Sequence, residues 1–332
     1  MIVTGAAGFL GSRLARELLA AGSRLTLIDQ APVPPDLAAD ERVVAIEGDL
    51  NELLDPGPDV LAGAEVIFHL AAAVSAECEA DFDLGIRANL RATEALFASC
   101  RALATRPVVV FASSLAVFGG SAEHSLPAVV GDDTLPNPQT SYGVQKFIGE
   151  QLLADYTRKG FLRGRSVRLM TVCVRPGRPN AAASGFMSSI IREPLAGQRA
   201  RCPVDPGTEV ALASPGKAID ALLRAATSDD QDWGGRTAVT MPALTVTVGD
   251  MAAALERIAG PEVSSLIDWE PDPAVARIVS GWPATIRADR AARLGLTPDP
   301  DFDTIIRTHI AESRLGDSPG GAFRPPAVPP PA

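Results

Sequence analysis

The chain has 332 residues, 46% of them hydrophobic, which is enough for a large core in one domain or in two unequal lobes. Its formal net charge is −10 and its Lys and Arg residues are scattered, so no basic face is available for nucleic acid or an anionic membrane. No apolar run approaches the roughly 20 residues that span a bilayer, and we expect a cytoplasmic protein.

The cysteines and the N-terminus agree with that expectation. The four cysteines show neither paired close spacing nor a secretory context, so we expect reduced, buried thiols and no metal site. Met1 leads directly into the first predicted strand, without the basic segment or cleavage site of a signal peptide. That strand is shorter than the usual five or six residues. We therefore expect a few residues to precede Met1 in the natural protein.

The first predicted elements are a short strand at Ile2 and Val3, a glycine-rich turn and a helix. The turn reads T-G-A-A-G-F-L-G, and Gly5, Gly8 and Gly11 fall where the strand passes into the helix. Without a Cβ, the chain turns tightly, approaches a pyrophosphate closely and packs its helix on the sheet. The sequence therefore predicts a dinucleotide site here, formed by the three glycines with Phe9 and Leu10.

The second predicted strand, R-L-T-L-I-D, ends in Asp29, which follows Gly11 at close to the roughly 20-residue offset of a ribose ligand. Its carboxylate would accept a hydrogen bond from a ribose 2′-hydroxyl and repel a 2′-phosphate. The cofactor expected is therefore NAD, not NADP. The alternative is an ordinary aspartate in the turn that ends a strand.

Strand and helix signals then alternate, as in a parallel sheet with helical crossovers. We expect strands at Arg42–Leu50, Ala64–Ala73, Pro107–Ser114 and Ser166–Val174, and helices at Phe82–Leu103 and Ser141–Thr157, the latter capped by Ser141. The fold class predicted is α/β, a Rossmann doubly wound parallel sheet whose ligands bind at the carboxyl ends of the strands. The residues at such ends are Asp49, Ala71, Ala72, Ser113 and Ser114.

After Arg175 the alternation breaks, prolines and glycines become more frequent, and the expected elements are short. We predict an NAD-binding domain at 1–176, a smaller α/β substrate lobe at 177–318, and a Pro-rich tail at 319–332. Some elements of the second lobe are expected to return to the first. Its helices are predicted near Gly185–Arg192, Gly216–Ala226, Gly249–Ile258 and Phe302–Leu315.

The predicted proton-transfer residues are Tyr142 and Lys146, four positions apart and hence on one face of a helix. A lysine there would lower the pKa of the phenol, with help from a positive nicotinamide ring, and make it a usable general base. Ser114 ends the neighbouring strand and would hydrogen-bond the same substrate oxygen. Ser113 is the other candidate for this hydrogen bond, and the purely structural alternative is that both serines only cap the strand. Tyr156, further along the helix, is expected to pack.

These motifs, T-G-A-A-G-F-L-G, H-L-A-A-A, S-S-L-A-V-F-G and S-Y-G-V-Q-K, together resemble the extended short-chain dehydrogenase/reductase family as far as about Pro179. The resemblance implies that Ser114, Tyr142 and Lys146 are catalytic. It also implies cofactor contacts at Ala71 and Asn89, and adenine contacts at Asp49 and Leu50. The cofactor site expected as a whole is Gly5, Gly8, Phe9, Leu10, Gly11, Asp29, Asp49, Leu50, Ala71, Ala72, Asn89, Ser113, Tyr142, Lys146 and Arg175.

The two residues that directly follow the catalytic serine differ between members of this family with different activities. Its sugar-nucleotide dehydratases carry an acid pair there, whereas this chain has Leu115 and Ala116, which cannot transfer protons. Dehydratase activity is therefore unexpected. Epimerase or reductase activity on a sugar nucleotide stays open, although few aromatic residues follow Arg175 to stack on a nucleotide base.

Longer segments, including V-R-P-G-R-P-N-A-A-A-S-G-F-M-S-S-I-I-R-E-P-L, look like the D-erythronate dehydrogenase family. That resemblance implies oxidation of the 2-hydroxyl of D-erythronate to 2-dehydro-D-erythronate with NAD. A substrate carboxylate needs a cation, and Arg178 or Arg192 would supply it beside a helix N-terminus. Each arginine is equally well interpreted as a surface residue paired with an acid such as Glu193.

Further substrate contacts are expected from Ser75 and Asn180, together with Ser114 and Tyr142. His124 lies on a loop that could overhang the substrate, but a loop histidine more often faces solvent.

A non-catalytic NAD-sensing protein is the alternative of another class, and the retained Ser114, Tyr142 and Lys146 argue against it. Family resemblance implies a homodimer formed through the two long helices.

Overall fold

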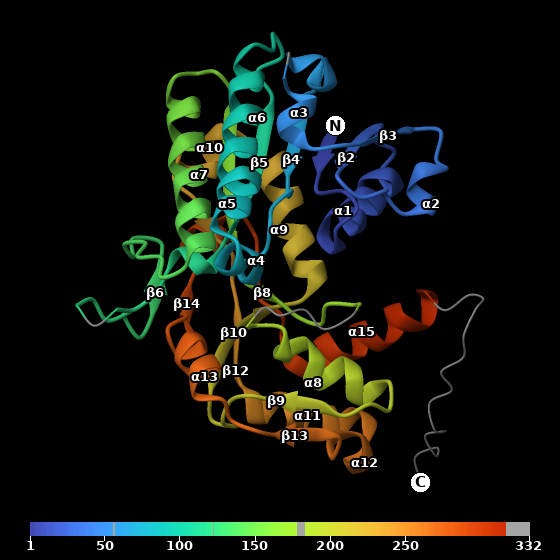
Figure 1. Cartoon of the computed structure of the whole chain (residues 1–332), viewed down its shortest axis with the longest axis vertical. Coiled ribbons are helices and arrows are strands. Elements are labelled where there is room, and N and C mark those ends of the chain that lie inside the picture. The colour runs from blue at the N-terminus through green and yellow to red at the C-terminus, as the bar shows by residue number, and fades with distance from the viewer. Residues whose placement is uncertain (56, 122, 178–182, 317–332) are drawn as a thin grey trace.

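The computed structural model describes residues 1–55, 57–121, 123–177 and 183–316, and Figure 1 shows a lobe built around a large sheet above a smaller lobe. The glycine-rich start forms β1 (Ile2–Thr4) and α1 (Phe9–Ala20), as its helical leucine spacing predicts. The chain continues through β2 (Leu25–Asp29), α2 (Pro35–Ala38), β3 (Val43–Glu47), α3 (Leu50–Leu53), the short 3₁₀ turn η1 (Pro58–Leu61) and β4 (Val66–His69).

The second half of the large sheet follows the same alternation. Its helical segments are α4 (Ser75–Ala80), α5 (Phe82–Gly85), a π-helical segment η2 (Ile86–Arg91), α6 (Ala92–Arg101), the 3₁₀ turn η3 (Leu115–Val117) and α7 (Ser141–Arg158). Its strands are β5 (Val108–Ser114) and β7 (Arg163–Leu169), with a short β6 (Val130–Gly131) in the connection before α7.

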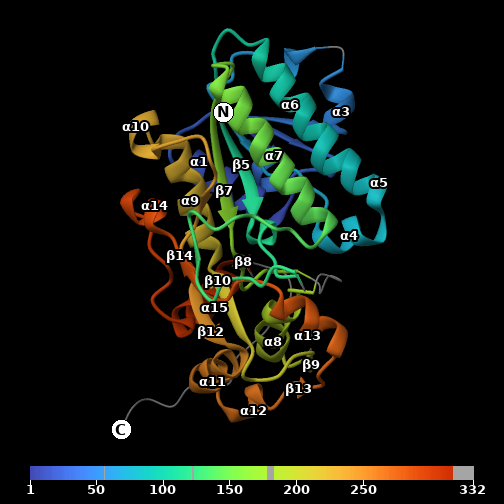
Figure 2. The same ribbon diagram turned by 90° about the vertical axis from the view of Figure 1, so that its left-hand side faces the viewer.

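Seven strands form one parallel sheet in the order β11-β7-β5-β4-β1-β2-β3, in which β11 is Val239–Thr240. Figure 2 shows α5, α6 and α7 on one face of this sheet and α1 and α9 (Pro215–Thr227) on the other. The predicted doubly wound Rossmann fold is therefore confirmed. The strand order reverses between β1 and β4, which is where such folds bind their ligands.

The smaller lobe holds short strands and most of the remaining helices. Its strands are β8 (Thr171–Val172), β9 (Ala200–Cys202), β10 (Glu209–Ala213), β12 (Leu244–Thr247), β13 (Ile267–Trp269) and β14 (Ile286–Arg287). Its helices are α8 (Phe186–Leu195), α11 (Val248–Ala259), α12 (Pro261–Ser264), α13 (Pro273–Ser280) and α15 (Phe302–Gly316), whereas α14 (Asp289–Arg293) packs on the large lobe beside β11. A three-stranded sheet, β12-β10-β8, and the pair β13-β9 pack with α8 and α11 around an apolar cluster of their own.

Several segments late in the chain return to the large lobe. Helix α9 (Pro215–Thr227) packs on β5 and β7, and β11 (Val239–Thr240) pairs with β7 at the sheet edge. The short helix α10 (Asp230–Trp233) lies between them in sequence. Strand β14 also pairs with β6 in the connection before α7. The domain boundary at residue 176 stays a prediction, because the chain crosses between the lobes more than once. The Pro-rich tail lies outside the described residues.

Three local predictions were wrong in detail. The strand expected at Ser166–Val174 is divided at Met170, because β7 belongs to the large sheet and β8 pairs with β10 in the small one. Helix α7 is capped by Thr140, not Ser141, since the Thr140 hydroxyl accepts from the Gly143 amide at 3.1 Å. The long helix expected from Phe82 is interrupted by the π-helical segment. Within the described ranges, no helix combines the length and the apolar character that crossing a membrane requires.

Candidate active site

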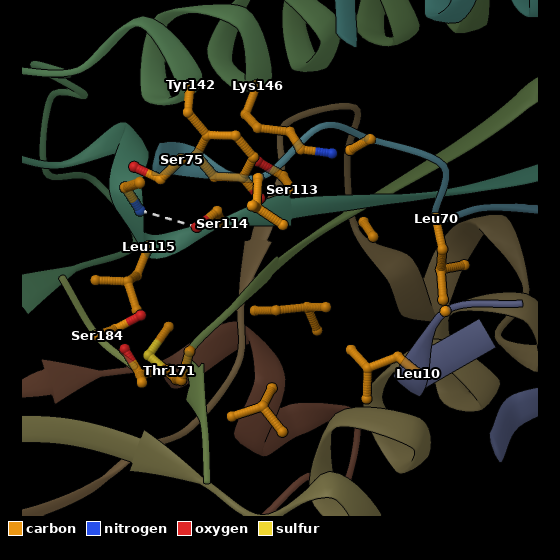
Figure 3. Close-up of a pocket in the computed structure, with 18 of the residues that line it drawn as sticks. Leu10, Leu70, Ser75, Ser113, Ser114, Leu115, Tyr142, Lys146, Thr171 and Ser184 are labelled. Carbon is orange, nitrogen blue, oxygen red and sulfur yellow. Dashed lines mark hydrogen bonds between the residues drawn. The ribbon is translucent and has the colours of Figure 1, made fainter. Parts of the chain in front are cut away.

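A cavity of about 350 Å³ opens at the carboxyl ends of β1, β4 and β5, facing the second lobe. Figure 3 shows Tyr142 and Lys146 descending from α7 on one side, Leu10 and Leu70 on another, and Thr171 and Ser184 opposite Tyr142. The predicted site residues that line it are Gly5, Gly8, Phe9, Leu10, Gly11, Ala72, Ser75, Ser113, Ser114, Tyr142, Lys146 and Arg175. The glycine loop and the proton-transfer residues therefore share one space.

Other predicted residues lie elsewhere. The cavity lining does not include Asp29, Asp49, Leu50, Ala71, Asn89 or Arg192. Arg178 and Asn180 lie outside the described residues, so the predictions that place them at the substrate stay untested. His124 is exposed and also absent from the lining, in keeping with the solvent-facing alternative.

The glycine loop fits a dinucleotide because its backbone leaves no room for side chains. Gly5 has φ +73°, and a Cβ there would lie 2.6 Å from the Ala71 amide nitrogen. A Cβ on Gly11 would lie 2.0 Å from the Gly5 carbonyl oxygen. Gly8, the N-cap of α1, has no side chain to satisfy the first amides of that helix. Those amides and the open Gly8 surface are what a pyrophosphate requires.

Asp29 lies beside this loop although it does not line the cavity. Its carboxylate accepts from the Ala7 amide at 2.9 Å and from the Ala31 amide at 3.0 Å. It thereby fixes the loop and keeps a negative charge at the end of β2, where a ribose would bind. Asp49 instead caps α3, accepting from the Asn51 amide at 2.8 Å, and Leu50 is buried in the core. Neither residue offers its side chain to the cavity.

Ser114, Tyr142 and Lys146 converge because β5 ends beneath the first turns of α7. The Lys146 Nζ lies 5.6 Å from the ring centroid of Tyr142 and 4.9 Å from that of Phe111, so the cation is held between two aromatic rings. Lys146 is 3% exposed. The Ser114 hydroxyl accepts from the Ala116 amide at 3.1 Å, so its own proton can be donated to the Tyr142 oxygen or to a ligand.

Burial dominates the titration of this pair. It raises the pKa of the Tyr142 phenol to about 12, while the Ser114 hydroxyl and the charge of Arg175 lower it. It also lowers the pKa of the Lys146 ammonium to about 8. The expectation that Lys146 would leave Tyr142 with a lowered pKa is therefore wrong for the protein alone. Dehydration of the phenolate outweighs every charge around it.

Ser113 is committed to a buried ion pair. Its hydroxyl donates to the Glu150 carboxylate at 2.5 Å, and the Arg168 guanidinium donates to both oxygens of the same carboxylate. Ser113, Glu150 and Arg168 are each at most 5% exposed. Ser114 is therefore the better placed of the two serines to bind a substrate oxygen.

Asn89 supports the site from behind. It lies in the π-helical segment η2 and exchanges hydrogen bonds with the backbone of Ala73, at 2.8 and 3.1 Å. Its amide also donates to Gln145 on α7 at 2.8 Å. These contacts use the Asn89 side chain within the protein, and its contact with the cofactor stays a prediction. The side chain holds a cavity-lining segment against the helix that carries Tyr142.

The sequence analysis missed several cavity residues, namely Thr140, Thr171, Ser184 and Trp282. Isolated hydroxyl residues give no pattern in a sequence, and Trp282 reaches the cavity from a segment late in the chain. It also missed His69, which is fully buried between Thr4 and Thr93 and stacks on Phe111. The H-L-A-A-A motif contained this signal, but burial of the imidazole could not be deduced from it.

The arginines after β8 have different surroundings. Arg192 donates to the Arg175 carbonyl at 2.6 Å and pairs with Glu193 at 2.6 Å, as the alternative to a clamp predicts, but the pair is largely buried and not on the surface. Arg175 lines the cavity, where its Nε donates to the Val172 carbonyl at 3.1 Å and one terminal nitrogen to Ser184 Oγ at 3.0 Å.

In sequence and in structure, this chain is similar to NAD-dependent enzymes and to their relatives. Residues 1–224 match the model of the NAD dependent epimerase/dehydratase family. The D-erythronate dehydrogenase of Cupriavidus necator is 48% identical over 95% of this chain and 99% of that protein. The D-erythronate dehydrogenase of Haemophilus influenzae is 39% identical over 93% and 98%. A crystal structure described as the nucleoside-diphosphate-sugar epimerase from Agrobacterium tumefaciens superposes with a TM-score of 0.88 at 42% identity, covering 96% of this chain and 94% of that one.

Proposed function

Because this chain belongs to the NAD dependent epimerase/dehydratase family, we propose that it is an NAD-dependent dehydrogenase that oxidises D-erythronate to 2-dehydro-D-erythronate. The observation that carries the proposal is the cavity shared by the glycine loop and by Ser114, Tyr142 and Lys146. Two relatives matched over nearly their whole length carry the D-erythronate dehydrogenase name, which supports a sugar acid as the substrate.

The residues of this chain supply proton transfer and orientation. Tyr142, as phenolate, takes the proton from the C2 hydroxyl, and Ser114 holds that oxygen through a hydrogen bond. Lys146, fixed between the Phe111 and Tyr142 rings, favours the phenolate by its charge. When bound, NAD supplies the hydride acceptor and the positive charge of its oxidised ring. Gly5, Gly8 and Gly11 would hold its pyrophosphate, and Asp29 its adenosine ribose.

A steady-state assay tests this function directly. Purified protein with NAD and D-erythronate should accumulate NADH, and with NADP it should be much slower. Tyr142→Phe should retain NAD binding and lose roughly 10²- to 10⁴-fold in turnover, the range of general acid–base catalysis. Absence of NADH with D-erythronate would refute the proposed substrate. Turnover of Tyr142→Phe near the wild-type rate would refute the proposed base.

The runner-up is a sugar-nucleotide epimerase or reductase. One observation favours it, since Trp282 lines the cavity and offers an aromatic face to a nucleotide base. An epimerase would convert a sugar nucleotide without net change in NADH, so the same assay with product analysis separates the two activities. The third hypothesis, a non-catalytic NAD-sensing protein, predicts NAD binding with no turnover of either substrate class.

The protein is further proposed to act in the cytoplasm as a homodimer. Its four cysteines are free thiols, which a reducing compartment maintains. Phe82, Val144 and Ile148, on α5 and α7, are 61%, 42% and 36% exposed, and such apolar side chains are suited to pairing with a second copy. Ile148→Glu should halve the mass measured by analytical ultracentrifugation, whereas Leu135→Glu, at an exposed position outside the two helices, should leave it unchanged. A monomeric wild-type protein would refute the dimer.

A further inference from the structure

Arg175 carries a cation in the wall of the catalytic cavity without an acidic partner. Within the described part of the chain, no carboxylate lies within ion-pair distance of its guanidinium, whereas Arg168 and Arg192 each pair with an acid. Its two hydrogen bonds, to the Val172 carbonyl and to Ser184 Oγ, go to neutral oxygens and leave the other terminal nitrogen without a described partner. The guanidinium is therefore oriented but not neutralised.

A half-buried charge of this kind favours an anionic ligand. Removing a cation from water is costly unless a partner of opposite charge replaces the lost hydration, and burial lowers the pKa of Arg175. The planar fork of an arginine matches a carboxylate through two parallel hydrogen bonds. Because Arg175 lines the cavity, an anion that pairs with its guanidinium would belong to the bound substrate.

The position of Arg175 specifies where that anion lies relative to the reacting carbon. In a 2-hydroxy acid the carboxylate is bonded to the carbon that bears the reacting hydroxyl, so its cation must lie close to the general base. Arg175 meets this condition, because it lines the same cavity as Tyr142 and donates to Ser184, whose side chain lies opposite Tyr142 in Figure 3. Lys146, another cation in the lining, is occupied by the Tyr142 and Phe111 rings.

We propose that Arg175, oriented by Ser184, binds the C1 carboxylate of the substrate and selects small 2-hydroxy acids over neutral polyols. This assignment rests on the proposed dehydrogenase function. It reassigns Arg175, expected from the sequence to contact the cofactor. Arg192 would help to position Arg175, since its hydrogen bond to the Arg175 carbonyl and its pairing with Glu193 fix the backbone at Arg175.

The experiment compares arginine substitutions on an acid and on its neutral counterpart. Arg175→Met should raise KM for D-erythronate about 100-fold, the loss expected for a charge-assisted hydrogen-bonded pair, with a much smaller change in kcat. Arg175→Lys should recover about tenfold of that loss, because the charge returns without the fork. Activity on erythritol, in which CH₂OH replaces the carboxylate, should change little. Arg201→Met, at an exposed position paired with Glu270, is the matched control and should behave as wild type.

A binding measurement separates this proposal from the proposed function. D-erythronate and simpler 2-hydroxy carboxylates should raise the thermal midpoint of the NAD-loaded wild-type protein and not that of Arg175→Met, whose NAD affinity should be unchanged. If wild type shows this shift but does not oxidise D-erythronate, the proposed function is refuted, whereas the proposed role of Arg175 in binding the carboxylate is supported. The proposed role of Arg175 would be overturned if Arg175→Met kept the wild-type KM and thermal shift. It would also be overturned if Arg178→Met, and not Arg175→Met, showed these losses. No shift of wild type by any carboxylate would also overturn it.

Discussion

The Arg168 guanidinium donates to both carboxylate oxygens of Glu150, from Nε at 2.9 Å and from a terminal nitrogen at 2.7 Å, and both side chains are buried. The pair joins β7 to α7 one turn after Lys146, and the Arg168 guanidinium lies 4.8 Å from the ring centroid of Phe118. The Glu150 carboxylate also accepts a hydrogen bond from the Ser113 hydroxyl. The helix that carries the proton-transfer residues is thus tied to the sheet by a buried charge network.

Breaking this pair should destabilise the protein strongly. Arg168→Met leaves a buried carboxylate unpaired, and we expect it to cost about 3–5 kcal/mol of unfolding free energy. Glu150→Gln in the same chain removes that charge and keeps an acceptor for Ser113, so the double variant should recover part of the loss. Urea unfolding of both single variants and the double variant measures the coupling. Arg201→Met, at an exposed pair, should cost less than about 1 kcal/mol, and an equal cost for Arg168→Met would contradict the expectation.

Substitutions of the adjacent residues Ser113 and Ser114 should have different effects, on stability and on catalysis respectively. Ser114→Ala removes the hydroxyl that faces the cavity, and we expect kcat to fall roughly 10²- to 10³-fold, as for loss of one oxyanion donor. Ser113→Ala removes a hydrogen bond to Glu150 and should lower stability by about 1–3 kcal/mol with a smaller effect on turnover. Kinetics and urea unfolding of both variants provide the comparison. A larger kinetic effect at Ser113 would reverse the assignment.

The pH dependence of the reaction should follow the phenol. Because burial raises the pKa of Tyr142 to about 12, the active phenolate is a minor form near neutrality. Below its pKa that form increases about tenfold per pH unit, so kcat/KM should rise steadily from neutral to alkaline pH. Lys146, with its pKa lowered to about 8, loses its charge over the same range and should limit the rise. In Lys146→Met the profile should shift to still higher pH. A wild-type rate that falls between neutral pH and pH 8 would contradict this mechanism.

The fold was predictable because its signals are local. Glycines at the first turn, apolar runs in the strands and leucines at helical spacing each lie within a short segment, and together they indicate a parallel sheet. Pairing between distant segments was not predictable. Nothing near Val239 marks β11 as an edge strand of the large sheet, and nothing near Ile286 indicates its partner Val130.

The same distinction applies to the site. Tyr142 and Lys146 were found from a spacing within one helix, and Ser114 from the end of a strand. Arg175 was expected at the cofactor, and its place in the cavity wall, hydrogen-bonded to Ser184 with no ion pair among the described residues, depends on packing that the sequence does not show. The neighbours of Arg192 include Glu193 at the next position, and the structure shows that they pair.

Cofactor preference should depend on the charge of Asp29. Asp29→Asn removes the negative charge at the ribose position, so we expect weaker NAD binding and a smaller preference for NAD over NADP, by roughly tenfold in the ratio of kcat/KM. The Ala7 amide, which donates to Asp29, still finds an acceptor in Asn, which limits damage to the glycine loop. Asp36→Asn, at an exposed pair with Arg16, is the control and should leave the ratio unchanged. An unaltered ratio in Asp29→Asn would support the alternative of a turn residue.

Acid stability should depend on His69. Its imidazole is fully buried, with Nδ1 2.7 Å from Thr4 Oγ1 and Nε2 2.9 Å from Thr93 Oγ1, and burial lowers its pKa to about 3. Between that value and the ordinary pKa of about 6.5, the unfolded chain binds a proton that the folded protein excludes. This residue should therefore reduce the unfolding free energy by about 1.4 kcal/mol for each pH unit as pH falls below 6.5.

The variant His69→Gln keeps polar atoms between the two threonines and does not titrate. Its unfolding free energy, measured by urea at pH 7, 6, 5 and 4, should fall less steeply with acidification than that of wild type. His124→Gln, at an exposed position, should retain the wild-type slope. If His69→Gln and wild type lose stability in parallel, then the acid sensitivity arises elsewhere. The carboxylates with lowered pKa, Asp36, Asp230 and Asp268 among them, would be the next groups to substitute, because their stabilising charge is also lost as pH falls.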